Sequence, residues 1–107
     1  MELIWSDEDA QYVRNRSNRY PSALDIEPEW TQEAVDDEHC VKLNPYPRSR
    51  VGATGYIGYS PSAKHVLVVI AYADLDGGMH GMNSWPASGR DLATYRKAVE
   101  DDEQARQ

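Results

Sequence analysis

An unbroken run of eight apolar residues, from Val66 to Ala73, is the feature that most limits how this chain folds. The run is far shorter than the roughly 20 residues that a membrane-spanning helix needs. Its valines and isoleucine favour a strand, and a strand that is apolar on both faces must be covered on both sides. The segment His65–Asp74 therefore predicts a central strand of a sheet.

The segments on either side predict two further strands. Thr54, Tyr56, Ile57 and Tyr59 are good sheet formers, and the polar segment 60–64 after them is typical of a turn. On the other side, Asp76-Gly77-Gly78 predicts a hairpin turn. A third strand is then expected from Met79 to Trp85, ending at Pro86.

Helices are predicted before and after these strands. Ser6 precedes three acidic residues, a pattern typical of a capped helix start, and the segment 20–22 around Pro21 ends that helix. A second helix is expected from Pro28, because proline suits the first turn of a helix. Pro45 and Pro47 then indicate an extended connection to the strands.

The last helix is predicted to begin at Ser88. Asp91 follows three residues later, which resembles a capping box. Leu92, Tyr95 and Val99 form its apolar stripe, and fraying is expected from Glu100 onward. The predicted fold is α+β, with two N-terminal helices, a small antiparallel sheet of three or four strands, and a C-terminal helix.

Length and charge narrow the class of protein. A chain of 107 residues predicts one domain over residues 1–107. The net charge of −7 argues against unaided, non-specific binding of nucleic acid. However, residues 39–90 carry five bases against two acids, whereas residues 1–38 carry eleven acids against three bases. This asymmetry is compatible with a polyanion on one face and a basic partner on another, or simply with solvated acidic helices.

Cysteine and histidine usage predicts no metal and no cofactor. Cys40 is the single cysteine, so an intramolecular disulfide is excluded, and the three histidines lack the ligand spacing of a zinc site. The N-terminus shows no signal peptide, and no segment is apolar enough for a membrane span. We therefore expect a cytoplasmic protein that does not enter a membrane.

A group of polar residues in or beside the predicted sheet has the composition needed to cleave RNA without a metal ion. Such cleavage requires a base for the 2′-hydroxyl, a cation for the charged phosphorane and an acid for the leaving oxygen. Histidine titrates near neutrality and arginine provides a permanent charge. The predicted catalytic residues are His80, Arg50 and Asp91, and the predicted RNA contacts are Arg48, Lys64 and Arg90. Each of these residues alone is also common on the surface of any sheet.

Aromatic residues allow two interpretations. Tyr56, Tyr72 and Trp85 are able to stack bases if one face of the sheet is open. The chain has no phenylalanine, however, so its aromatic residues must also build the core. We expect most of Tyr12, Trp30, Trp85 and Tyr95 to lie in that core.

The order of these segments resembles the BrnT-type toxins of bacterial type II toxin–antitoxin systems, within the RelE/ParE-like superfamily. The matching stretches are Ile4-Trp5-Ser6, Arg48-Ser49-Arg50-Val51-Gly52, Ile57-Gly58-Tyr59-Ser60, the strand Val66–Tyr72, and Trp85-Pro86-Ala87 with Asp91 and Tyr95. The resemblance implies a ribosome-independent endoribonuclease that a DNA-binding antitoxin, of the ribbon-helix-helix type, neutralises. Its substrate is then RNA, and a homo-oligomer is possible.

Departures from the family pattern support a second hypothesis from another class. Members commonly carry an arginine directly before the Pro-Ala pair, where this chain has Trp85, and a basic position of the third strand falls on His80. Where members carry a base in the first long strand, this chain has Ala53 and Tyr59, and Arg50, three residues before Ala53, is the candidate substitute. The alternative is a non-catalytic module of the same fold that binds a protein partner.

Overall fold

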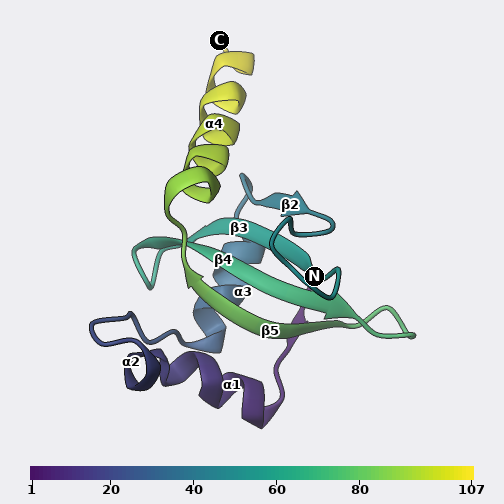
Figure 1. The fold of residues 1–107 in the computed structure, drawn as a ribbon. Helices are drawn as coiled ribbons and strands as arrows, with labels where there is room; N and C mark the ends of the chain where they lie inside the picture. The colour runs from purple at the N-terminus through teal and green to yellow at the C-terminus, as the bar shows by residue number, and fades with distance from the viewer.

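The protein, described over residues 1–107 by a computed structural model, is built on a five-stranded mixed sheet (Figure 1). The strand order is β1-β5-β4-β3-β2, in which only β1 and β5 run parallel. The elements in chain order are β1 (Leu3–Ile4), α1 (Asp7–Arg14), α2 (Arg16–Arg19), α3 (Pro28–Asp36), β2 (Val41–Leu43), β3 (Thr54–Ser60), β4 (His65–Ala73), β5 (Met79–Pro86) and α4 (Gly89–Ala105). The α+β class is confirmed.

The predicted number of strands and their predicted orientation were wrong in part. The sheet has five strands rather than three or four, and the pairing of β1 with β5 makes it mixed rather than antiparallel. β1 and β2 contain two and three residues, too few for an alternating pattern to appear in the sequence. Their pairing with β5 and β3 is a long-range interaction that local sequence does not encode.

Three helices, rather than two, precede β2. The Ser6 side chain accepts a hydrogen bond from the backbone N–H of Asp9 at 3.0 Å, so the predicted cap of α1 is confirmed. The chain turns at Asn15 and adds the short helix α2 before the predicted break at Tyr20. α3 begins at Pro28, as predicted.

The two faces of the sheet carry separate clusters of buried residues. On the α1–α3 face, Val13, Ala34, Leu67 and Val69 are fully buried. The opposite face buries Ile57, Val68, Ile70, Tyr46 and Tyr95. β4 supplies alternate residues to both clusters, which confirms that the apolar run is a central strand.

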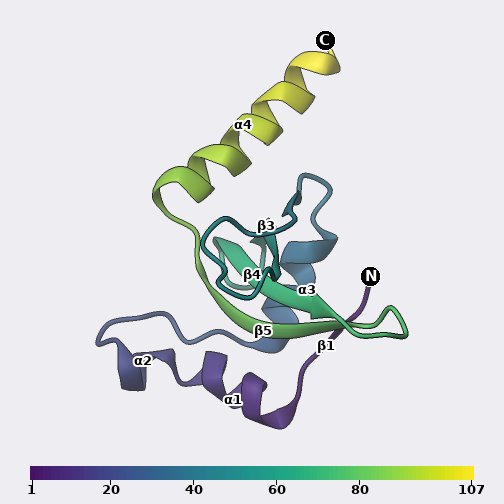
Figure 2. The ribbon, with the colours of Figure 1, turned by 45° about the vertical axis from the view of Figure 1, so that its right-hand side comes forward.

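α4 covers only part of that second face, and its C-terminal half projects from the sheet (Figure 2). Tyr95 is 8% exposed within the second cluster, and Val99 packs against it. Near its end, Asp102 lies 2.9 Å from His39 Nε2, and Arg106 pairs with Glu38 at 3.6 Å. The helix continues to Ala105, past Glu100, from which fraying was expected.

The predicted capping box of α4 does not form. Ser88 occupies the N-cap position, but its side chain makes no capping hydrogen bond. Asp91 bonds instead to Tyr46 and Arg48 of the β2–β3 loop. The carboxylate is therefore used for a tertiary contact rather than a local one.

The burial of two aromatic residues differs from the prediction made from the sequence. Tyr56 is 7% exposed on the α1–α3 face of the sheet, so its ring is closed to a stacking base. Tyr12, expected in the core, is 42% exposed on α1. Trp30 and Trp85 are partly buried against the two clusters, as expected of core aromatics. No helix has both the length and the apolar character that crossing a membrane requires.

Candidate functional site

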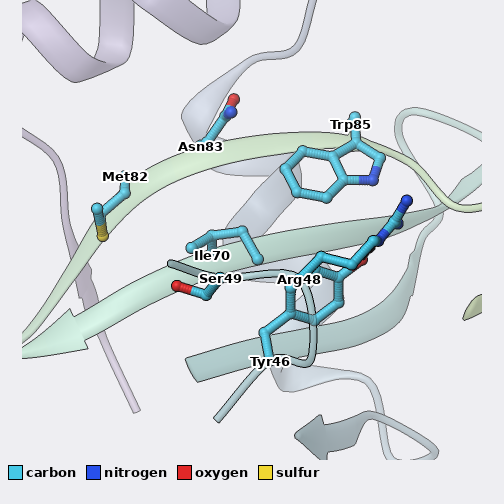
Figure 3. A pocket seen from close by; sticks show the side chains of 7 residues that line it. All are labelled: Tyr46, Arg48, Ser49, Ile70, Met82, Asn83 and Trp85. Atoms are coloured by element: carbon cyan, nitrogen blue, oxygen red, sulfur yellow. Dashed lines mark hydrogen bonds between the residues drawn. The ribbon is translucent and has the colours of Figure 1, made fainter. Parts of the chain in front are cut away.

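A pocket of about 490 Å³ opens on the sheet face opposite α1 and α3 (Figure 3). The β2–β3 loop forms one wall, and β4 and β5 form the floor. We call it the Trp85 pocket, and its lining residues are Tyr46, Arg48, Ser49, Ile70, Met82, Asn83 and Trp85. Its floor is mainly apolar and aromatic, while its rim carries a guanidinium, a hydroxyl and an amide.

A β-bulge explains why β5 lines this pocket with consecutive residues. Ile70 pairs with Asn83 but the next residue, Ala71, pairs with Gly81, which leaves Met82 as an extra residue in β5. Met82 and Asn83 therefore both line the pocket, although Figure 3 shows their side chains on opposite sides of β5, with the Asn83 amide pointing away from the β2–β3 loop.

Arg48 is held at the rim by two neighbours. Its Nη2 donates to the Tyr46 hydroxyl at 2.6 Å and to Asp91 Oδ2 at 3.1 Å. The Tyr46 hydroxyl in turn donates to Asp91 Oδ2 at 2.6 Å. The Arg48 side chain is nevertheless 72% exposed, whereas that of Asp91 is 13% exposed. The cation is thus positioned by a more buried carboxylate while it stays open to a ligand.

The protonation states in this network follow from its geometry. Burial, followed by the hydrogen bond to Asp91, raises the pKa of Tyr46 above its usual 10.0. The hydrogen bond to Tyr46 raises the pKa of Arg48 as well. At neutral pH the phenol is therefore neutral and the guanidinium is charged. The Tyr46 ring also meets Trp85 edge to face, with ring centroids 6.0 Å apart.

A second hollow of about 310 Å³ adjoins the pocket on the α4 side of Arg48. Its lining includes Tyr46, Arg48, Arg90 and Asp91. Two arginines, one exposed on α4 and one on the loop, thus flank a single carboxylate. The structure brings together three residues that the sequence predicted for the site, namely Arg48, Arg90 and Asp91.

The structure does not bring the other predicted site residues to this pocket. His80 lies near the start of β5, about 16 Å from Trp85 along the strand at 3.3 Å per residue. Its Nε2 bonds Asp74 Oδ2 at 2.7 Å, and its ring stacks on Tyr72 with centroids 5.0 Å apart. Arg50 and Lys64 are exposed on two different connections, without a side-chain hydrogen bond or ion pair. Asp91 bonds to Arg48 and Tyr46 and makes no hydrogen bond to His80 or Arg90.

Sequence reasoning missed Tyr46, the residue that joins Arg48 to Asp91. It is 3% exposed, and the one available signal was its place in Pro45-Tyr46-Pro47-Arg48, where an extended chain aligns Tyr46 and Arg48. Met82 and Asn83 gave no signal, because a bulge depends on strand pairing.

No group of three or more histidine, cysteine or acidic residues is placed to hold a metal ion. Comparison of the sequence with known protein families and with curated proteins found no match.

Proposed function

We propose that this protein is a toxin-like endoribonuclease with a RelE/ParE-like fold, which binds single-stranded RNA in the Trp85 pocket and cleaves it without a metal ion. One observation carries the proposal: an exposed arginine, Arg48, is fixed by Tyr46 and Asp91 at the rim of an aromatic and apolar pocket. Single-stranded RNA is recognised by this combination, because its bases stack on apolar or aromatic surfaces while its phosphates meet cations.

The network supplies two of the three groups that RNA cleavage needs. In the proposed reaction, the Asp91 carboxylate takes the proton of the 2′-hydroxyl, whose oxygen attacks the adjacent phosphorus. Arg48 and Arg90 stabilise the charged phosphorane, and the bond to the 5′-oxygen breaks as water protonates that oxygen. Catalysis by such groups commonly contributes about 10²–10⁴-fold each.

RNA cleavage and RNA binding are tested together with the purified protein and a long single-stranded RNA in the presence of EDTA. We expect cleavage, and we expect Arg48→Gln to weaken RNA binding about tenfold, which corresponds to the removal of one charge-assisted hydrogen bond. Arg96→Gln is the matched control, because it removes an equal charge from an exposed position of α4 outside the pocket. RNA binding that is equal in all three proteins contradicts the proposal.

His80 and Arg50 are tested in the same assay. The role predicted from the sequence requires His80→Ala to lower cleavage at least tenfold, and Arg50→Gln to lower it too. The arrangement around Arg48 instead predicts that Asp91→Asn has the largest effect on cleavage.

A protein partner belongs to the same proposal. The acidic N-terminal segment, with eleven acids in residues 1–38, favours a basic partner such as a ribbon-helix-helix antitoxin. Induction in a bacterial host, with and without the adjacent reading frame, is expected to stop growth and degrade RNA only when that frame is absent.

A non-catalytic binding module of this fold is the second candidate. It is favoured by the raised pKa of Tyr46, which makes the phenol a poor proton donor, and by the separation of His80 from Trp85 along β5. RNA that binds in an Arg48-dependent way but stays intact, together with unchanged growth on induction, would establish this candidate.

A further inference from the structure

A third pocket, distinct from the hollow beside Asp91 and also of about 310 Å³, lies on the other side of β5 from Arg48. It is formed where α1 and α2 run alongside that strand (Figure 1), and we call it the α2 pocket. Its lining residues are Tyr12, Arg16, Arg19, Tyr20, Asn83 and Trp85. Asn83 and Trp85 also line the Trp85 pocket, so the two pockets meet at β5.

Backbone carbonyls, rather than carboxylates, hold both arginines of the α2 pocket. Arg16 Nη1 donates to the carbonyl of Leu24 at 2.9 Å, and Arg19 Nη2 donates to the carbonyl of Tyr12 at 2.7 Å. The guanidinium carbon of Arg19 lies 3.6 Å from the centroid of the Tyr12 ring. This arrangement fixes the position of two cations without neutralising either of them.

The nearby carboxylates are engaged elsewhere. Asp25 accepts hydrogen bonds from Ser17, and Glu27 pairs with Arg14 at 3.1 Å. Burial, followed by the charge of Arg19, lowers the pKa of Arg16, and the opposing effect of Asp25 is smaller. The buried Nε of Arg19 also has no hydrogen-bond partner. An anion in this pocket would offset the repulsion between the two guanidinium groups.

We propose that Arg16 and Arg19 form a second phosphate site, which binds the backbone of the RNA strand next to the base held in the Trp85 pocket. This inference rests on the proposed RNA binding, because continuity at Trp85 and Asn83 gives the strand its path. Tyr20 is 56% exposed beside the two guanidinium groups and provides a stacking surface for the flanking base. The four arginines 16, 19, 48 and 90 then form one cationic band across β5 in an acidic protein.

The test compares a single-stranded RNA of about 12 nucleotides with one of about three, both labelled with fluorescein. We expect the double variant Arg16→Gln/Arg19→Gln to bind the longer RNA about tenfold more weakly and the short RNA unchanged. The slope of log affinity against log salt for the longer RNA should fall by about 0.7 for each phosphate that the variant no longer binds. Arg14→Gln is the matched control, because this arginine lies on α1 but is already paired with Glu27.

Tyr20→Ala keeps the test valid if the double variant is unfolded, since the Tyr20 ring is exposed and its hydroxyl makes no hydrogen bond. It is expected to weaken binding of the longer RNA about fivefold or more, in line with stacking energies of about 1–3 kcal/mol per base. If Arg48→Gln binds the longer RNA more weakly than the wild type does, the proposed RNA binding holds. The inference is then overturned if the double variant binds that RNA as tightly as the wild type. If the double variant is unfolded, the same result for Tyr20→Ala overturns it. If the wild type binds neither RNA, the proposed function itself has failed.

Discussion

Tyr95 joins α4 to the sheet through both its ring and its hydroxyl. The ring is 8% exposed in the second cluster, and the hydroxyl donates to Asp37. We expect Tyr95→Ala to lower the free energy of unfolding by about 3–5 kcal/mol, because it empties a large aromatic site. Tyr95→Phe keeps the ring, and Asp37 keeps the N–H groups of His39 and Tyr59, so its cost should be about 1 kcal/mol.

Urea denaturation of the two variants measures this difference. A Tyr95→Ala protein that unfolds at the same urea concentration as the wild type would show that α4 is not docked through this residue. Equal losses of stability in both variants would assign the stabilisation to the hydroxyl rather than to the ring.

At the scale of elements, α3 approaches β3 so closely that only glycine fits between them. A Cβ atom added to Gly58 would lie 2.7 Å from the carbonyl carbon of Ala34, and backbone cannot move aside as a side-chain tip can. We expect Gly58→Ala to lower the free energy of unfolding by about 3 kcal/mol, near the upper end for overpacking. In Gly81→Ala the obstructing group is the Trp5 ring, so its cost should be smaller, as measured by thermal unfolding.

Glu33 links α3 to the turn between β3 and β4. Hydrogen bonds from Ser60 and then Ser62 lower the pKa of Glu33 below its usual 4.5. Because the pKa is lower in the folded state, this stabilisation is full above the unfolded-state pKa. It is lost as the pH falls through the folded-state pKa.

The difference in urea midpoint between the wild type and Glu33→Gln should therefore be largest near neutral pH and shrink below about pH 4.5. Glu29→Gln is the control on the same helix, because the exposed Glu29 makes no side-chain hydrogen bond. A difference that stays constant between neutral and acidic pH would contradict this role of Glu33.

At the scale of the whole molecule, Cys40 reports on the integrity of the fold. It lies between α3 and β2 and packs against the first buried cluster. Burial, followed by the charge of Asp37, raises its pKa to about 11. At pH 8 we expect the native thiol to react slowly with a disulfide reagent and the unfolded thiol to react at the ordinary rate, because the thiolate is the reactive form. Equal rates in native and denaturing buffer would contradict the burial of Cys40.

Local sequence patterns predicted the elements that are long enough to show a period. The apolar run of β4, the cap at Ser6 and the proline at the start of α3 each act over a few residues, and each was predicted correctly. Gly58 allows a close approach of backbone between β3 and α3, which depends on the packing of two distant segments. The two short strands were missed, because a pattern of two or three residues carries no period.

Residue types pointed to Arg48, Arg90 and Asp91, but their arrangement depends on contacts between distant parts of the chain. Asp91 is 43 residues from Arg48 in sequence and 3.1 Å away in space. His80 was grouped with these residues because all of them lie in or beside the predicted sheet, yet α4 begins beyond the opposite end of β5 from His80.

Local sequence was enough to establish the α+β class, the central strand and the starts of α1, α3 and α4, since hydrogen bonding and burial within an element follow its own residues. The spatial arrangement of the site residues, in contrast, depends on tertiary contacts. The loop carrying Tyr46 and Arg48 folds over the sheet, and the bulge in β5 makes both Met82 and Asn83 lining residues of the pocket. α2 brings Arg16 and Arg19 beside Trp85. These contacts join segments far apart in the chain, and their energies depend on the packing of all of them together.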